Sequence, residues 1–299
     1  MNIIELNNRF GVDGHLVFSE GQNGLVMAEI TSKYSSGKIS LYGAQVLSFI
    51  PKGGKDLLLV SEKSSFEKSK PIRGGIPLCF PWFGGHPSKP ELPMHGFARL
   101  SDWEVVLSHK ADDGSVRIKL GLSWNEQSKK LWPFEFHTEL EVIFGKNLEL
   151  NWLIDNTGNS LFEVTSAMHT YFAVEDVAKA RVEGVEGVSF YDSANGGVLT
   201  AGESHPLIIN QEVNRLYVDT TSACKVVDTA MNRTILLMKS GSSSTIIWNP
   251  WIETSKKIAD LGDEEYKQFL CVESGNVKNN FVVIEPGQAH FTTLMIGCE

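Results

Sequence analysis

Three successive segments of the chain alternate apolar and polar residues with a period of two. They cover residues 115–124, 134–144 and 147–155. Because neighbouring side chains of a β-strand point to opposite faces, this alternation is typical of strands with one buried and one solvated face. Turn sequences rich in Gly, Asn and Asp lie between these runs, where residues with positive φ can reverse the chain. The pattern predicts an antiparallel meander.

Shorter apolar runs predict further strands along most of the chain. They lie at residues 39–50, 103–107, 223–227, 234–238, 245–248, 269–273 and 290–296. Helical periodicity is confined to short stretches at 64–69, 253–259 and 263–269. Because strands do not alternate with long helices, a parallel α/β sheet is disfavoured. The predicted fold class is all-β, a large antiparallel β-sandwich with few short helices.

The length of the chain fits two domains or one large sandwich. It has 299 residues, and β-sandwiches commonly reach about 250 residues as one domain. We find no change of composition, no linker rich in Ser, Gly or Pro, and no repeat with the period of a solenoid or propeller. We therefore expect a single domain over residues 1–299.

Charge and composition exclude several classes of partner. The 27 Lys and Arg against 36 Asp and Glu give a net charge of −9, and without a basic run nucleic acid is not an expected partner. No apolar stretch approaches the roughly 20 residues that span a bilayer. The N-terminus shows no secretory signal, so we expect a cytoplasmic protein. Its four dispersed cysteines are expected to be reduced and mostly buried.

One segment resists regular structure and has the composition of a functional loop. Residues 71–93 contain many Pro and Gly residues together with Phe80, Trp82 and Phe83. Irregular chain of this length inside a compact domain is usually functional. Its aromatic residues suit the wall of a concave binding site.

Three residues have the chemistry of acids and bases. His95 follows the irregular segment beside a glycine, His169 lies in an apolar run, and Glu273 ends an apolar strand before Ser-Gly-Asn. Burial would raise the pKa of such a carboxyl toward the value that a general base needs. The residues alone leave open that both histidines are structural and that Glu273 is a solvated strand terminus.

Two arginines and one aspartate add possible substrate contacts. Arg73 and Arg99 flank the irregular segment, and a planar guanidinium favours bidentate binding of phosphate or carboxylate. Asp219 could accept a hydrogen bond from a hydroxyl group. Surface salt bridges for the arginines and a turn-forming role for Asp219 remain open alternatives.

Motifs for several cofactors are missing from the sequence. It has no phosphate loop, Rossmann GxGxxG, HExxH, GxSxG or EF-hand pattern. Its eight histidines show no spacing of metal ligands. We expect neither a metal ion nor another cofactor.

Six blocks of sequence resemble one enzyme family. The blocks are GAQVLS at 43–48, IRGGIP at 72–77 with PWFG at 81–84, HGFAR at 95–99, HTYF at 169–172, WNPW at 248–251 and CVESGN at 271–276. Together they resemble the hexose-6-phosphate mutarotases, or glucose-6-phosphate 1-epimerases, of the aldose 1-epimerase superfamily. The blocks occur in the family's order and span about residues 40–285.

The resemblance implies a fold and an active site. The fold is a galactose-mutarotase-like β-sandwich with an open carbohydrate cleft. Glu273 matches the catalytic base, His169 the catalytic acid and His95 a second active-site histidine. Arg73 and Arg99 match the phosphate end of the site.

The remaining implied contacts are less central to the chemistry. Asp219 corresponds to a carboxylate that holds sugar hydroxyls, and Gln45 and Trp82 lie in blocks implied to contact substrate. Ser274 departs from the Pro that often follows the glutamate in relatives. This departure puts the rigidity of that turn in question, but not the carboxylate.

The expected activity is interconversion of the α and β anomers at C1 of a hexose 6-phosphate, with glucose 6-phosphate as the leading substrate. A base removes the C1 hydroxyl proton while an acid protonates the ring oxygen, so no cofactor is needed. We expect a monomer that takes a small sugar phosphate and binds neither nucleic acid nor membrane. The alternatives are a mutarotase of neutral aldoses, a non-catalytic carbohydrate-binding module and a glycoside hydrolase, which would need a second carboxylate.

Overall fold

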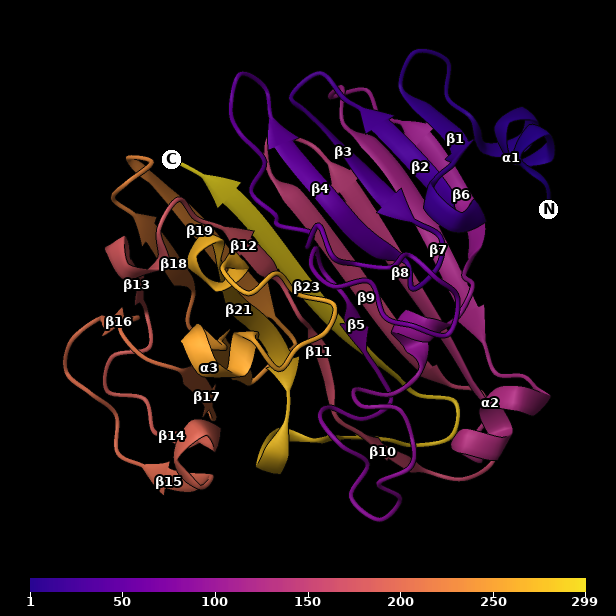
Figure 1. Cartoon of the computed structure of the whole chain (residues 1–299). Coiled ribbons are helices and arrows are strands. Elements are labelled where there is room, and N and C mark those ends of the chain that lie inside the picture. The colour runs from indigo at the N-terminus through magenta and orange to yellow at the C-terminus, as the bar shows by residue number, and fades with distance from the viewer.

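The structure is a computed structural model that describes all residues from 1 to 299, and it consists mainly of antiparallel strands (Figure 1). Its largest sheet has nine strands. From edge to edge these are β16 (Leu207–Ile208), β13 (Ala180–Glu183), β18 (Cys224–Asp228), β19 (Arg233–Ser240), β23 (Ala289–Cys298), β9 (Leu148–Asn156), β8 (Phe136–Phe144), β7 (Val116–Ser123) and β6 (Glu104–Lys110). The predicted all-β class is confirmed.

Three smaller sheets complete the architecture. An eight-stranded sheet runs β15 (Val198–Thr200), β14 (Phe190–Asp192), β17 (Val213–Tyr217), β20 (Ser244–Asn249), β21 (Phe269–Asn276), β11 (Ser166–Met168) and β5 (Leu78–Cys79), and β12 (Tyr171–Ala173) also pairs with β21. A four-stranded sheet contains β1 (Leu16–Glu20), β2 (Val26–Thr31), β3 (Ser35–Ser40) and β4 (Gln45–Pro51). The last sheet pairs β10 (Phe162–Val164) with β22 (Val282–Ile284).

The predicted meander forms the middle of the large sheet. Strands β7, β8 and β9 follow one another as antiparallel neighbours, and β9 alternates buried and half-buried residues along its whole length. Its buried face includes Trp152. Fully burying one large apolar side chain stabilises a fold by about 1.5–3 kcal/mol, so the alternation that identified these strands is also what attaches them to the core.

One cluster of 58 buried apolar residues joins the layers. Figure 1 shows β2 to β4 lying over β7 to β9, where Phe49 of β4 packs against Phe144 of β8 with ring centroids 5.8 Å apart. Phe80, just after β5, packs edge-on against Trp152 of β9 at 6.2 Å. The nine-stranded sheet therefore forms one layer of the sandwich, and the four- and eight-stranded sheets cover it.

Several local predictions differ from the structure. The apolar run at 39–50 divides into the end of β3 and the whole of β4, because Gly43 and Ala44 adopt positive φ and turn the chain. Residues 64–69 form turns and loop in place of the predicted helix. The stretch at 253–259 is helical only as α3 (Trp251–Ser255), and that at 263–269 only as a 3₁₀ turn, Glu265–Gln268.

Two helices were not predicted from the sequence. Both α1 (Ile3–Phe10) and α2 (Glu126–Leu131) begin at capping boxes, in which Asn2 and Asn125 accept hydrogen bonds from the first turn. Such caps stabilise a helix start by about 1 kcal/mol, which suits helices too short to show clear periodicity. None of the helices has the length and apolar character that a membrane crossing requires. All four cysteines are free thiols, and only Cys298 is exposed.

The fourth and sixth sequence blocks, residues 169–172 and 271–276, lie next to each other in the eight-stranded sheet. Strand β21 pairs with β20 on one side and with both β11 and β12 on the other. Two residues, His169 and Thr170, separate β11 from β12. Their backbone remains tied to the irregular segment, because the N–H of His169 donates to the carbonyl of Pro77.

We predict that Gly96→Ala destabilises the fold strongly. Gly96 has φ of 73°, and a Cβ added there would lie 2.0 Å from the carbonyl oxygen of Phe80. Gly14→Ala is the matched control, because Gly14 has φ of 68° but no atom within 4 Å of the added Cβ. Urea unfolding should show a loss for Gly96→Ala that exceeds the control by roughly 2 kcal/mol. Equal losses would show that the close approach of the two backbones is unimportant.

Candidate active site

The register of the sheet places His169 across from Glu273. Met168 at the end of β11 pairs with Ser274, and Tyr171 at the start of β12 pairs with Cys271. The same register, continued across the break, sets His169 opposite Glu273, and directly opposed residues of antiparallel strands have neighbouring side chains. His169 Nδ1 and Glu273 Oε1 lie 3.4 Å apart. Two residues separated by more than a hundred positions thus form one pair.

Both members of this pair are buried. Glu273 is 1% exposed and His169 is 6% exposed. Neither His169 Nδ1 nor Glu273 Oε2 has a hydrogen-bond partner within the protein. Buried polar atoms are normally satisfied, so these two atoms mark a place where a ligand would complete the hydrogen bonding.

Burial moves the pKa values of the two groups in opposite directions. It raises the pKa of Glu273 well above the ordinary value, and the nearby charge of Arg99 opposes this rise. It lowers the pKa of His169 well below the ordinary value, and His95, Arg99 and Arg73 lower it further. Low polarity disfavours each charged form, so burial favours the carboxylic acid form of Glu273 and the neutral imidazole of His169.

His95 forms the neighbouring wall and is held in one tautomer. Its ring lies edge-on to that of His169, with centroids 5.6 Å apart, and to that of Phe83 at 4.8 Å. The backbone N–H of Gly84 donates to His95 Nδ1 over 3.1 Å. Because Nδ1 accepts this bond, the proton of the neutral ring lies on Nε2, which can donate to a ligand oxygen.

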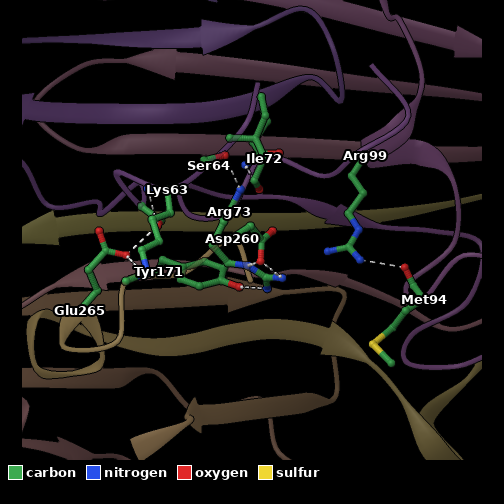
Figure 2. Close-up of polar contacts among 12 residues, drawn as sticks. Lys63, Ser64, Ile72, Arg73, Met94, Arg99, Tyr171, Asp260 and Glu265 are labelled. Atoms are coloured by element: carbon green, nitrogen blue, oxygen red, sulfur yellow. Dashed lines mark hydrogen bonds and ion pairs between the residues drawn. The ribbon is translucent and has the colours of Figure 1, made fainter. Parts of the chain in front are cut away.

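Arg99 is a buried cation without an acidic partner. It is 7% exposed, and none of the ion pairs of the structure includes it. Its Nη2 donates to the carbonyl oxygen of Met94 over 2.8 Å, whereas its Nε has no hydrogen-bond partner (Figure 2). Burying a charge is costly unless it is paired. An anion from a ligand would supply the missing partner.

Arg73 is held on two sides by protein groups. Its Nε and Nη2 donate to Asp260 Oδ1 over 3.2 and 3.0 Å, and its Nη1 donates to the hydroxyl of Tyr171 over 3.1 Å (Figure 2).

Gln45 supports the backbone next to Arg73, because its Nε2 donates to the carbonyls of Ile72 and Gly74. Gln45 therefore contacts the chain on either side of Arg73, and its role in the structure is to shape that segment.

The charges of the cluster do not cancel. Asp260 balances Arg73, burial favours the neutral forms of Glu273 and the two histidines, and Arg99 remains as one excess positive charge. Surroundings of low polarity strengthen the attraction of such a charge for an anion. The site therefore favours a negatively charged ligand.

Two expected contacts lie outside this cluster. Asp219 is exposed, and its carboxylate accepts a hydrogen bond from the side chain of Asn280. Trp82 is 5% exposed, donates its indole N–H to the carbonyl of Pro93 and packs against the ring of His86. Asp219 lies just beyond the end of β17, and Trp82 lines a surface pocket with Phe83; substrate contact by either residue stays a prediction.

Three residues of the cluster were missed as site residues. Tyr171 stacks on His169, Trp248 lies edge-on to both rings, and Asp260 binds Arg73. Tyr171 and Trp248 stand inside the fourth and fifth sequence blocks, which was a usable signal. Asp260 follows the short helix α3 and carries no signal in its local sequence. No group of three His, Cys, Asp or Glu side chains is arranged to hold a metal ion.

Solved structures share this architecture. A protein described as a putative mutarotase from Salmonella typhimurium has a TM-score of 0.89 and 26% identity, over 97% of this chain and 95% of that one. A galactose mutarotase-like protein from Clostridium acetobutylicum has a TM-score of 0.73 over 95% of this chain, at 16% identity. The fold is thus a β-sandwich of the galactose-mutarotase-like class.

Sequence comparison identifies the family. The aldose 1-epimerase family pattern matches residues 27–296. A protein of Escherichia coli K12 named "Putative glucose-6-phosphate 1-epimerase" is 35% identical over 255 residues, 84% of this chain and 83% of the relative. One of the same name from Cenchrus ciliaris is 34% identical over 259 residues, 84% of this chain and 78% of the relative. The chain belongs to the aldose 1-epimerase family, and it is an isomerase.

We predict that His95 does not titrate near neutral pH. Burial, together with the charges of Arg99 and Arg73, lowers the pKa of His95 to about 3. The ring should therefore remain neutral, protonated on Nε2, from pH 8 down to well below its ordinary pKa of about 6.5. Nitrogen NMR of ¹⁵N-histidine-labelled protein measures this directly, with His95→Gln used for assignment. A midpoint near pH 6.5 would contradict the described environment.

Proposed function

We propose that this protein interconverts the α and β anomers of a hexose 6-phosphate, with glucose 6-phosphate as the preferred substrate. The observation that carries the proposal is the buried pair of His169 and Glu273 beside the unpartnered cation Arg99. The pair supplies a proton donor and acceptor, and the cation supplies the counter-charge for a phosphate. The names of the curated relatives, which carry glucose 6-phosphate, support this substrate.

The reaction requires two coupled proton transfers. The carboxylate form of Glu273 takes the proton from the C1 hydroxyl, the C1–O5 bond breaks, and His169 gives a proton to O5. The pyranose thereby opens to an aldehyde. Rotation about C1–C2 presents the other carbonyl face, and the same transfers in reverse close the ring as the other anomer. A raised pKa makes Glu273 a stronger base than an ordinary carboxylate.

Binding of the phosphate would prepare His169 for its role as the acid. In the free protein the positive charges of Arg99 and Arg73 help to keep the pKa of His169 low. A phosphate dianion bound to these arginines cancels their field, so the pKa of His169 rises and its protonated form becomes accessible. A proton can then move within the pair from Glu273 to His169. The bound substrate thus creates the base and the acid together.

The structure bears on two of the alternative reactions. The buried, unpartnered Arg99 favours an anionic sugar over a neutral aldose, because a neutral sugar brings no counter-charge for it. A glycoside hydrolase needs a second free carboxylate near the first, whereas the other carboxylate of this cluster, Asp260, is engaged by Arg73. Both observations favour epimerisation of an anionic sugar.

We also propose that the protein acts in the cytoplasm. Its four cysteines are free thiols, whereas structural disulfides form in oxidising compartments. Fractionation of the native cells tests this location, and recovery of the protein in a secreted fraction would contradict it.

We predict that Glu273→Gln and His169→Gln each lower the rate of anomer exchange of glucose 6-phosphate by about 10²–10⁴-fold, the usual contribution of one positioned proton transfer. NMR saturation transfer between the two anomers measures the rate. Glu139→Gln is the control, because Glu139 pairs with Lys119 on the strands β8 and β7, outside the site. Wild-type protein that does not accelerate exchange would refute the proposed function.

We predict two effects of Arg99→Gln. KM for glucose 6-phosphate should rise by about tenfold or more, because the counter-charge for the phosphate is lost, while KM for neutral glucose changes little. Arg99 also adds to the effect of burial in lowering the pKa of His169. Without Arg99 that pKa rises, so the pair takes up a second proton, and activity falls, at a higher pH.

The matched control for this prediction is Arg215→Gln. Arg215 pairs with Glu203 away from His169 and Glu273. Steady-state kinetics from pH 5 to 9 on both sugars separate the two effects. An equal rise of KM for glucose and for glucose 6-phosphate would show that Arg99 does not recognise the phosphate.

A further inference from the structure

The orientation of His169 is not fixed by a hydrogen bond to its ring. Nδ1 has no hydrogen-bond partner within the protein, and its contact with Glu273 at 3.4 Å does not have the geometry of one. Catalytic histidines usually owe their orientation to a hydrogen bond on the nitrogen that does not react. Another interaction must hold this ring.

That interaction is a parallel stack with Tyr171. The two rings have centroids 4.8 Å apart and planes within 10° of each other. Trp248 meets both rings edge-on, each at 6.0 Å, and His95 meets the ring of His169 edge-on from its own side. Stacked and edge-on arrangements of this kind are preferred by aromatic rings. The plane of the imidazole is therefore set by aromatic contacts.

Tyr171 is itself held firmly. It is 1% exposed, and its backbone pairs with Cys271 of β21 and donates to the carbonyl of Gly75. Its hydroxyl accepts a hydrogen bond from Arg73 Nη1, as Figure 2 shows. One face of the Tyr171 ring therefore contacts His169, the proposed acid, and the Tyr171 hydroxyl contacts Arg73, which is proposed to bind the phosphate.

Arg73 has donors left for a phosphate while it binds Tyr171. A guanidinium carries five N–H groups, and three are engaged by Asp260 and Tyr171. One N–H on each terminal nitrogen remains free. An anion that accepts hydrogen bonds from these N–H groups binds the same guanidinium that donates to the Tyr171 hydroxyl. Any movement of the Tyr171 ring is transmitted to His169 through the stack.

We propose that Tyr171 is a positioning residue that sets the plane of His169 and couples it to the occupancy of Arg73. The inference deepens the proposed function and rests on it, because it takes the phosphate of the substrate as the anion at Arg73. Through Tyr171, binding at the phosphate end of the sugar orients the acid at the C1 end. Remote binding energy used in this way raises kcat in addition to lowering KM.

Two substitutions separate the stack from the hydroxyl. Tyr171→Phe keeps the aromatic face and removes the acceptor for Arg73, so KM for glucose 6-phosphate should rise about fivefold to tenfold. Its kcat should fall by only about threefold to tenfold, because the plane of His169 is kept while its coupling to the phosphate is lost. Tyr171→Leu removes the face, so kcat should fall by about 100-fold, the size of effect that a misplacement of about 1 Å produces. A purely structural role would not divide KM and kcat in this way.

Tyr217→Phe is the matched control. Tyr217 is also buried, and its hydroxyl accepts from Arg215 Nη1 at 3.5 Å, away from His169. The control should leave both constants at wild-type values. If Tyr171→Leu keeps kcat within threefold of wild type, or if Tyr171→Phe loses kcat as severely as Tyr171→Leu, the inference is overturned. Inactive wild-type protein would instead refute the proposed function.

A second measurement does not depend on activity or on the folding of Tyr171→Leu. ¹⁵N-histidine-labelled wild type and Tyr171→Phe are titrated with inorganic phosphate, with His169→Gln used for assignment. Phosphate should shift the ring nitrogen signals of His169 in wild type, and the shift should be less than half as large in Tyr171→Phe. Equal shifts in the two proteins would overturn the coupling.

Discussion

The pairing of β21 with β11 and β12 is the constraint on which the site depends. Two short strands dock on one long strand in a single continuous register, and the two residues that separate them lie opposite Glu273. A slip of one residue would turn the side chain of His169 or Glu273 to the other face of the sheet. The pairing with β20 on the far side fixes β21 against such a slip. The geometry of the His169–Glu273 pair is therefore a property of the sheet.

Burial determines the electrostatics of the His169–Glu273 pair and of Arg99. The same dry surroundings raise the pKa of Glu273, lower the pKa of His169 and leave Arg99 without a counter-charge. Each of these conditions is unfavourable in the free protein. In the proposed mechanism a sugar phosphate relieves them together, since it brings an anion to Arg99 and Arg73 and hydroxyl groups to Glu273 and His169.

The sequence predicts the scaffold better than it predicts the site. Alternation located β7 to β9 because those strands bury one face only, but it could not show where the run at 39–50 turns, since Gly43 and Ala44 interrupt it through positive φ. His169 and Glu273 were ambiguous as single residues and gained their meaning from the surrounding blocks. Their proximity depends on strand register, which local sequence does not encode.

The placement of two aspartates has the same origin. Asp219 follows β17, which is separated from β21 by β20, and its carboxylate accepts a hydrogen bond from Asn280 outside the cluster. Asp260 shows the reverse case: it enters the cluster from a loop beyond α3, and only the tertiary fold brings it to Arg73. Side chains recruited from loops are the part of a site that periodicity cannot reveal.

A crystal structure with glucose 6-phosphate bound tests the central claim most directly. The account predicts the phosphate on Arg99 and Arg73, the C1 hydroxyl within hydrogen-bond distance of Glu273, and O5 within reach of His169. A sugar phosphate bound elsewhere, or bound here with C1 directed away from both residues, would contradict it.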